Sequence, residues 1–330
     1  MEWTEPDQLA AKVRWVESLL QRDVDQATPS PRSLGYRARI ALKTDEQGRL
    51  GYHRPRSHEW LAVPECAIAR PELNQALDAL PTLPGIPTVS LRTDGHRVVL
   101  AASLRRRRAR RPDKRAVERA SQVLGALDLS ATSLSGVALD GRPVGGDCTL
   151  RLSVGGIEHH LGPESFFQVN LEANELLVER VVQQVLARSP QTVLDLYSGA
   201  GNLSFPIAKQ GVDVVQVEVE GSSVSDARST AKRLGIPVTI QARDVGRLEA
   251  GEIFFDVVIL DPPRAGAPGV LEELLLTRPR ALVYVSCNPE TLARDLGPAR
   301  SQGYAIRHLE VFDMFPQTSH VETLCVLERA

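Results

Sequence analysis

The chain of 330 residues is long enough for two domains whose hydrophobic cores need no disulfide or metal to stabilise them. Hydrophobic residues at 42% and charged residues at 24% exclude a disordered or fibrous protein, and no apolar run approaches the roughly 20 residues that cross a bilayer. The first residues are acidic and polar, unlike a secretory signal, so we predict a cytoplasmic protein that does not bind membranes.

Basic residues are concentrated in the first part of the chain. Residues 1–150 contain 23 lysines and arginines against 18 aspartates and glutamates, whereas residues 151–330 contain 16 against 23. The first part is therefore the better candidate for contact with a polyanion. Its densest basic segment, the Arg105–Arg115 run, is equally typical of a solvated loop.

The N-terminal half is predicted to begin with a helix and to continue as an antiparallel sheet. Residues 6–20 place Leu9, Val13, Val16 and Leu20 at helical spacing, and a breaker cluster follows at 28–32. From residue 36 to about residue 100, short alternating segments are separated by Gly, Pro and Asp, which is typical of antiparallel strands. A helix near 114–127 and further strands up to about residue 161 complete this part.

From Asn170 onward the pattern changes to strands that alternate with helices. Asn170 can cap a helix, and the segment TVLDLYSGAG is a buried strand that leads into a glycine turn. Further strands are predicted at 213–219, 238–240, 255–260 and 281–286. This alternation predicts an α/β fold with a doubly wound, mostly parallel sheet, whose ligands bind at the carboxyl ends of the strands.

Two of these strand ends resemble an adenosine-binding site. Gly199 and Gly201 let the backbone approach a ligand, but Ser204 stands where a dinucleotide fingerprint has its third glycine. Glu218 ends the next strand, where an acidic side chain can bind a ribose diol. Together they favour an adenosine cofactor without phosphates, S-adenosylmethionine.

Two further aspartates end strands of the same sheet. Asp244 can accept a hydrogen bond from an adenine amine, although a role as a turn or helix cap is a serious alternative. Asp261 lies between an apolar strand and Pro262-Pro263, which fixes it at the open edge of the sheet.

Cys287 is the candidate nucleophile. It follows a buried strand and precedes Asn288 and Pro289, which can begin a helix, and a thiol at a helix start is expected to have a lowered pKa. The other cysteines, Cys66, Cys148 and Cys325, show no sign of activation. The four cysteines have no paired spacing, so we expect neither a zinc site nor an iron–sulfur cluster.

Two residues near the C-terminus can act as the base. His320 and Glu322 both precede the last predicted strand, and alternation places them on the same face. The spacing alone does not choose between them, and both can also be ordinary polar groups at a strand edge.

The motifs FFQVN at 166–170, DLYSGAGN, DPPR, SCNPETLARDL and DMFPQTSHVE occur in the same order as in the RNA uracil-5-methyltransferase family, which makes 5-methyluridine in transfer and ribosomal RNA. The segments GYRARIAL, RLGYHRPRSHE and CAIARPEL resemble the central domain of that family. We predict three parts: an N-terminal helix at 1–28, as its spacing indicates, and, as the resemblance implies, an α+β RNA-binding domain with an antiparallel sheet at 29–162 and a Rossmann-like class I methyltransferase domain at 163–330.

The resemblance also implies roles for individual residues. Cys287 would be the nucleophile and Glu322, rather than His320, the base. The chain differs from many relatives at Ser198, where they have Cys, and at Gln216, where they have Gly. It also resembles a short form without the upstream β-barrel domain and four-cysteine iron–sulfur motif. The implied S-adenosylmethionine contacts are Gln168, Tyr197, Asn202, Glu218, Asp244 and Asp261.

The predicted chemistry is methyl transfer to carbon 5 of uracil. Cys287 adds to carbon 6 and makes carbon 5 nucleophilic, and after methyl transfer Glu322 removes the carbon 5 proton. Arg264 is a candidate contact for the enolate oxygen or an RNA phosphate. The alternatives are a methyltransferase that acts on cytosine carbon 5 or on a nitrogen, and an RNA-binding relative without catalysis.

We expect a monomer that binds RNA with its target uridine flipped out of the stack. The candidate RNA contacts are Tyr52, His53, Arg54, Arg56 and the Arg105–Arg115 run.

Overall fold

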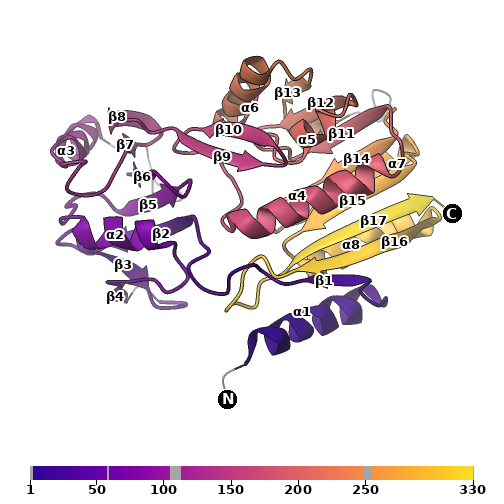
Figure 1. The fold of residues 1–330 in the computed structure, drawn as a ribbon, viewed down its shortest axis with the longest axis horizontal. Helices are drawn as coiled ribbons and strands as arrows, with labels where there is room; N and C mark the ends of the chain where they lie inside the picture. Colours follow the sequence, from indigo (N-terminus) through magenta and orange to yellow (C-terminus); the bar gives the residue numbers. More distant parts are fainter. Residues whose placement is uncertain (1–2, 58, 105–112, 249–253, 330) are drawn as a thin grey trace. The chain divides into compact units, whose positions relative to one another are not determined.

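The computed structural model describes residues 3–57, 59–104, 113–248 and 254–329 (Figure 1). These residues form two compact units. The larger unit comprises Met1–Ser33, Ser153–Glu158 and Phe166–Ala330, and the smaller unit comprises Leu34–Leu152 and His159–Ser165. The N-terminal helix thus groups with the C-terminal residues, while the predicted domain boundaries 1–28, 29–162 and 163–330 stay a prediction.

The larger unit is built on an eight-stranded sheet with the order β1-β16-β17-β15-β14-β11-β12-β13. Strands β11 to β15 are mutually parallel where they pair, and β17 is antiparallel to both β15 and β16. The order reverses between β11 and β14, so the predicted doubly wound, mostly parallel sheet is confirmed. The bounds are β1 Gln26–Thr28, β11 Thr192–Leu196, β12 Asp213–Glu218, β13 Thr239–Ala242, β14 Val257–Leu260, β15 Ala281–Ser286, β16 Tyr304–Phe312 and β17 Glu322–Arg329.

Helices cover both faces of this sheet (Figure 1). The first face carries α4 (Leu171–Leu186), α5 (Ser204–Ala208) and α6 (Gly221–Leu234), with Ser204 of α5 bonded to Asp195 of β11. The second face carries α1 (Glu5–Leu20), α7 (Val270–Leu276) and α8 (Pro289–Ser301), which share a core with Leu194 and Leu196 of the same strand. Because successive strand residues alternate, these contacts assign the two helix groups to opposite faces.

Helix α1 follows its sequence signals closely. Thr4 accepts a hydrogen bond from the Asp7 amide as the N-cap, and Gln21 ends the helix in the left-handed conformation with φ 52°. Its apolar side chains pack into the core that contains α8 and β16, as the helical spacing predicts. Lys12, however, is also buried on this helix, with 5% of its surface exposed.

The smaller unit contains a seven-stranded sheet with the order β4-β3-β2-β5-β6-β7-β8. All pairs are antiparallel except β6 and β7, which are parallel because α3 connects them as a crossover. The predicted antiparallel sheet is therefore confirmed apart from this pair. Its bounds are β2 Arg39–Thr44, β3 Leu50–His53, β4 Trp60–Ala62, β5 Thr88–Thr93, β6 Val98–Ser103, β7 Gly136–Leu139 and β8 Arg142–Gly146, with α2 Pro71–Ala79 and α3 Lys114–Gly125 packed on the core.

A separate hairpin of β9 (Leu150–Val154) and β10 (Ile157–Leu161) contributes residues to both units.

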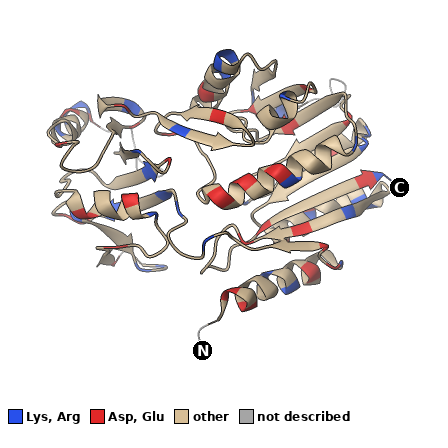
Figure 2. Cartoon of the chain, viewed as in Figure 1, with Lys and Arg blue, Asp and Glu red and all other residues tan. Residues whose placement is uncertain are grey.

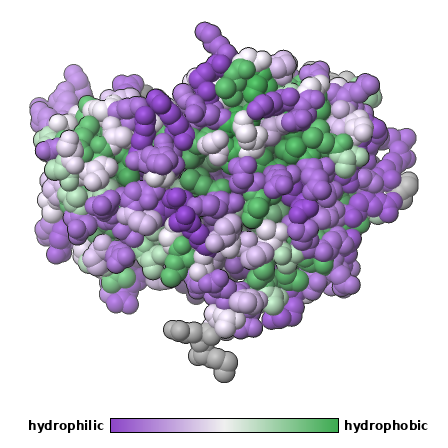
Figure 3. Space-filling model, viewed as in Figure 1, coloured by the Kyte–Doolittle hydropathy of each residue, from purple (hydrophilic) through white to green (hydrophobic). Residues whose placement is uncertain are grey.

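Across the described ranges, no helix is long and apolar enough to span a bilayer. Charged residues occur on most helices, including several acidic residues along α4 (Figure 2). Apolar side chains are exposed between polar ones on the face shown in Figure 3.

Candidate active site at the carboxyl ends of the strands

The predicted site residues lie at the ends of neighbouring parallel strands. The ends of β11, β12, β13, β14 and β15 all lie at the same edge of the sheet, because these strands are parallel. After or at these ends come the glycine turn 197–202, Glu218, Asp244, Asp261 and Cys287. The sheet therefore brings the predicted residues to one edge.

Cys287 and Glu322 are opposite each other across two antiparallel strands. Ser286 of β15 pairs with Thr323 of β17, so the next position places Cys287 opposite Glu322. By alternation both side chains point to the face of the sheet that α4 and α5 cover. Glu322 is 1% exposed and Cys287 is partly buried. The ring of His320 instead lies edge-on to Phe315, with the centroids 6.0 Å apart.

The surroundings of Cys287 raise the pKa of its thiol. Burial, together with the charges of Glu322 and Asp261, raises its pKa to about 11, while Arg264 has the opposite, smaller effect. The expectation of a lowered pKa is therefore wrong. Asn288 does cap α8, as predicted, but the helix start does not outweigh burial beside two carboxyl groups.

Three carboxyl groups occupy the same face of the sheet. Burial raises the pKa of Asp195 to about 7 and that of Asp261 to about 7, and it raises the pKa of Glu322 well above its ordinary value. Within the described ranges, Oδ1 of Asp195 and Oε1 of Glu322 are buried without a hydrogen-bond partner. Such a cluster suits a ligand with hydrogen-bond donors and a positive charge.

The glycine turn brings backbone amides close to Glu218. Tyr197 adopts a left-handed conformation with φ 61°, and Gly201 has φ 89°. A Cβ on Gly201 would lie 2.3 Å from the Phe205 ring, so this position requires glycine. Oε2 of Glu218 accepts a hydrogen bond from the Gly199 amide at 2.9 Å, and Oε1 accepts from the Val219 and Glu220 amides. Glu218 is thereby fixed beside the turn.

Asn202 is held by a residue that the sequence did not reveal. The side-chain amides of Asn202 and Asn174 donate to each other at 2.9 and 3.0 Å, and Asn174, on α4, is fully buried. An asparagine on the buried face of a predicted helix is the only sequence signal for this role. Gln168 is also buried, two residues before Asn170, which caps α4 as predicted.

Asp244 caps a short turn. Its carboxylate accepts a hydrogen bond from the Gly246 amide at 3.0 Å and begins the 3-10 helix η1 (Val245–Arg247). The capping alternative considered for this residue is thus present in the structure. Its side chain is exposed at the end of β13, and the contact with adenine stays a prediction.

The segment after Asp261 is fixed by the first turns of α8. Asn288 donates to the Arg264 carbonyl at 3.2 Å, and Arg294 donates to the Ala265 carbonyl at 2.7 Å. Asp295, which the sequence did not single out, accepts from the Ala267 amide at 2.7 Å. The carbonyl of Arg264 is therefore held, and the charge of its side chain acts on both Cys287 and Glu322.

Of the two departures from the family pattern, Gln216 lies beneath the glycine turn and Ser198 is part of it. Gln216 is fully buried on β12, and its Nε2 lies 2.8 Å from where a Cβ on Gly201 would be. The side-chain amide of Gln216 therefore fills the space that a glycine at position 216 would leave empty. Ser198 is also buried.

The candidate RNA contacts lie in the smaller unit. Arg105–Arg108, Arg110 and Arg111 of the basic run are outside the described residues, whereas Lys114 and Arg115 are exposed in the first turn of α3. Arg54 pairs with Glu59 at 2.9 Å next to the end of β3. Tyr52 is half-buried, and burial raises its pKa to about 12.

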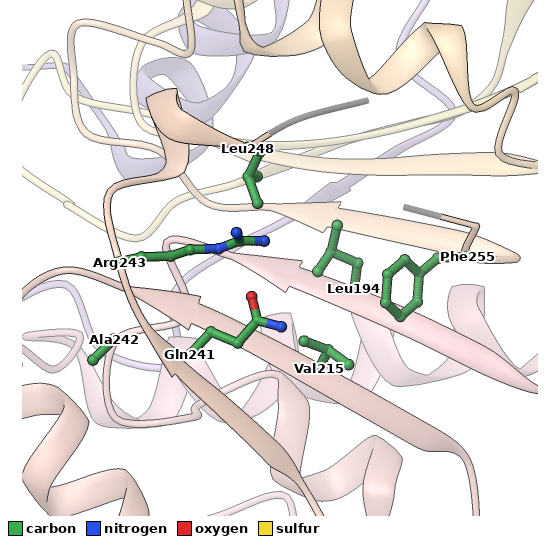
Figure 4. Close-up of a pocket in the computed structure, with 7 residues that line it drawn as sticks. All are labelled: Leu194, Val215, Gln241, Ala242, Arg243, Leu248 and Phe255. Carbon is green, nitrogen blue, oxygen red and sulfur yellow. The ribbon is translucent and has the colours of Figure 1, made fainter. Parts of the chain in front are cut away.

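A cavity lies apart from these residues. It has a volume of about 560 Å³ and is lined by Leu194, Val215, Gln241, Ala242, Arg243, Leu248 and Phe255 (Figure 4). Leu194 and Val215 point to the face opposite Asp195, so the cavity is not part of the carboxyl cluster. In the portion of the chain with described coordinates, no three His, Cys, Asp or Glu side chains are placed to hold a metal ion.

A doubly wound sheet with a glycine turn, an acidic residue at the end of the second strand and a partly buried cysteine opposite a buried glutamate is the arrangement of an S-adenosylmethionine-dependent methyltransferase. Residues 148–330 match the family model described as tRNA (Uracil-5-)-methyltransferase. The chain belongs to this family. The class predicted from the sequence, an S-adenosylmethionine-dependent RNA uracil-5-methyltransferase, is confirmed.

Individual relatives agree with this assignment. The chain is 33% identical over 340 residues to the 23S rRNA (uracil(1939)-C(5))-methyltransferase RlmD of Klebsiella pneumoniae, covering 98% of this chain and 77% of the relative. It is 34% identical to the RlmD of Pseudomonas aeruginosa, covering 98% and 76%. The crystal structure of Pyrococcus abyssi tRNA (uracil-54, C5)-methyltransferase in complex with S-adenosyl-L-homocysteine has the same fold, with a TM-score of 0.78, 24% identity and coverage of 98% and 83%.

Proposed function

We propose that this enzyme methylates carbon 5 of a uridine in RNA through a covalent bond between Cys287 and carbon 6 of uracil. The observation that carries the proposal is the strand register that sets Cys287 opposite the buried Glu322. A nucleophile and a base on adjacent strands can reach adjacent carbons of one ring. The comparisons support the reaction class, and the register supports this route to it.

The residues of the site divide the reaction into steps. The Cys287 thiol first gives its proton to water, and the thiolate bonds to carbon 6 while the electron pair of the 5,6 double bond moves into an enolate over carbon 5 and the carbon 4 oxygen, which makes carbon 5 nucleophilic. S-adenosylmethionine supplies the methyl group and a positively charged sulfonium. Glu322, as a carboxylate, then removes the proton from carbon 5, and the bond between carbon 6 and Sγ breaks to release the thiolate. The positive charge of Arg264 favours the ionised forms of Cys287 and Glu322, and S-adenosylhomocysteine is the leaving group of the methyl transfer.

The cofactor site is proposed from the residues at the strand ends. Glu218 would bind the ribose, the glycine turn would expose backbone amides, and the carboxyl of Asp261 would lie near the transferred group. Buried oxygens without partners on Asp195 and Glu322 fit a cation-bearing ligand on this face. The proposed contacts remain Gln168, Tyr197, Asn202, Glu218, Asp244 and Asp261.

We also propose a ribosomal RNA substrate. The two relatives at 33% and 34% identity are both named for 23S rRNA, which favours ribosomal over transfer RNA. The target uridine would be flipped out, because a stacked base cannot meet a thiol and a methyl donor together. Mapping of 5-methyluridine in RNA from a deletion strain tests the choice of RNA. A cytoplasmic monomer without an iron–sulfur cluster stays a prediction.

RNA that contains 5-fluorouridine tests the covalent route. After methyl transfer, fluorine cannot leave as a proton, so the enzyme is expected to remain bound to the RNA in a denaturing gel. Cys287→Ser should abolish this complex, and Cys66→Ser, at another partly buried cysteine, should retain it. A complex in Cys287→Ser would contradict the proposal. Absence of any complex with active enzyme would favour a nitrogen acceptor, and absence of turnover on unmodified RNA would favour an RNA-binding relative.

A further inference from the structure

Helix α1 lies outside residues 148–330, which the family model matches, yet it contacts the segment that leads to the proposed base. We propose that Lys12, with Gln8, is a positioning residue that fixes Glu322 through residues 313–321. We call these residues the base loop, because they connect β16 to Glu322 at the start of β17. This inference rests on the proposed role of Glu322.

Lys12 reaches the base loop as a buried cation. Its Nζ donates to Oδ1 of Asp313 at 2.6 Å and to the carbonyl of Phe315 at 3.0 Å. Lys12 and Asp313 are each 5% exposed. Burying a lysine on the apolar face of a helix costs free energy unless its charge is paired. If this position only had to fill the core, a hydrophobic residue would be sufficient. The pair therefore specifies where the base loop begins rather than simply filling the core.

Gln8 holds the same loop one helical turn earlier. Its Nε2 donates to Oε1 of Gln317 at 3.0 Å, and its Oε1 accepts from the Gln317 amide at 3.0 Å. Gln317 has φ 62°, a left-handed conformation that a residue other than glycine adopts only when its surroundings require it. The paired amides of Gln8 and Gln317 supply such a requirement.

The contacts continue from Lys12 toward Glu322. The Phe315 carbonyl that accepts from Lys12 also accepts from Oγ1 of Thr318 at 2.7 Å. Oγ1 of Thr318 in turn accepts from the His320 amide at 3.2 Å. Two residues later Glu322 begins β17 opposite Cys287. These hydrogen bonds end at the His320 amide, two residues before Glu322, so a displacement of Lys12 would reach the proposed base through them and the two peptide units that follow.

Cys287 is not part of this set of contacts. It follows β15 and precedes α8, whose first turn is capped by Asn288. Loss of the Lys12 contacts should therefore slow the removal of the carbon 5 proton, while addition of Cys287 and methyl transfer continue. The methylated RNA should then stay bound to the enzyme.

The test compares Lys12→Met, Lys12→Arg and Gln8→Ala with wild type on unmodified substrate RNA. A misplacement of about 1 Å can lower a rate about 100-fold, so Lys12→Met is expected to lower kcat by about 10- to 100-fold. A covalent RNA complex that is rare in wild type should accumulate, and deuterium at carbon 5 should now slow turnover. Lys12→Arg should restore part of the rate. Arg14→Met, at an exposed position of α1, should resemble wild type.

The outcomes separate this inference from the proposed function. If Lys12→Met loses complex formation on 5-fluorouridine RNA and turnover to the same extent, without an isotope effect, Lys12 is purely structural and the inference is overturned. Unchanged kinetics of Lys12→Met would also overturn it. If Lys12→Met does not fold, Gln8→Ala decides by the same two readouts. Glu322→Gln is the reference, because it should accumulate the complex fully. Failure of Glu322→Gln to do so would refute the base assignment and the positioning role together.

Discussion

The protonation state of Cys287 in the free enzyme can be measured by alkylation. With a pKa of about 11, about one thiol in a thousand is ionised at pH 8, against about one in four for an ordinary thiol of pKa about 8.5. Iodoacetamide should therefore modify Cys287 about 200-fold more slowly than an exposed peptide thiol at pH 8. The rate should rise about tenfold per pH unit up to pH 10, because each unit multiplies the thiolate fraction by ten.

Peptide mass spectrometry after timed alkylation gives this profile for Cys287 alone. Limited access to the thiol lowers all rates by one factor, so the shape of the profile reports the pKa. Arg264→Met should shift the profile to higher pH, because the Arg264 charge lowers the pKa of Cys287. A plateau below pH 9 in the free enzyme would refute the reasoning, since the carboxyl groups and burial would then not control the thiol.

Three further substitutions test the rest of the site. Gly201→Ala should abolish S-adenosylmethionine binding in calorimetry, whereas Gly211→Ala, with a similar φ of 86° but open space around it, should be only mildly destabilised. Asn174→Ala leaves the Asn202 amide unpaired, so we expect a loss of about 1–3 kcal/mol in stability and weaker cofactor binding, by urea titration and calorimetry. Asp195→Asn should stabilise the free enzyme by on the order of 4 kcal/mol at pH 8 and much less at pH 4. Asp195 has a pKa of about 7 in the folded protein, above its value in the unfolded chain, so its ionisation destabilises the fold as the pH rises from about 4 to about 7. Equal shifts of the melting temperature of Asp195→Asn at pH 4 and pH 8 would contradict this reasoning.

The main features of the fold were predictable because they depend on local signals. Alternating apolar strands and helices imply a parallel sheet, and a parallel sheet necessarily gathers the residues after its strands at one edge. The caps at Asn170 and Asn288 were predicted from residue type alone, and both accept the expected backbone hydrogen bonds. The parallel pairing of β6 and β7 was not predicted, because strand direction depends on the connection rather than on the strands themselves.

The electrostatics of the site were not predictable from neighbours along the chain. The sequence places Cys287 at a helix start, which favours a thiolate, but the two carboxyl groups that raise its pKa come from Asp261 after β14 and Glu322 on β17. Likewise Lys12 and Asn174 are polar residues on buried helix faces, and their partners lie far away in the sequence. Such pairs become visible only when the packing of the helices is known.

The choice between His320 and Glu322 shows how topology completes the site. Parallel strands bring only their carboxyl ends to the edge where a cofactor binds, and β17 is antiparallel to β15, so its amino end lies there instead. The first residue of β17 is thereby placed opposite Cys287, and that residue is Glu322. A base at the start of a strand has its position set by the segment before it. The position of the proposed base, Glu322, therefore depends on the base loop, which agrees with the positioning role that we propose for Lys12.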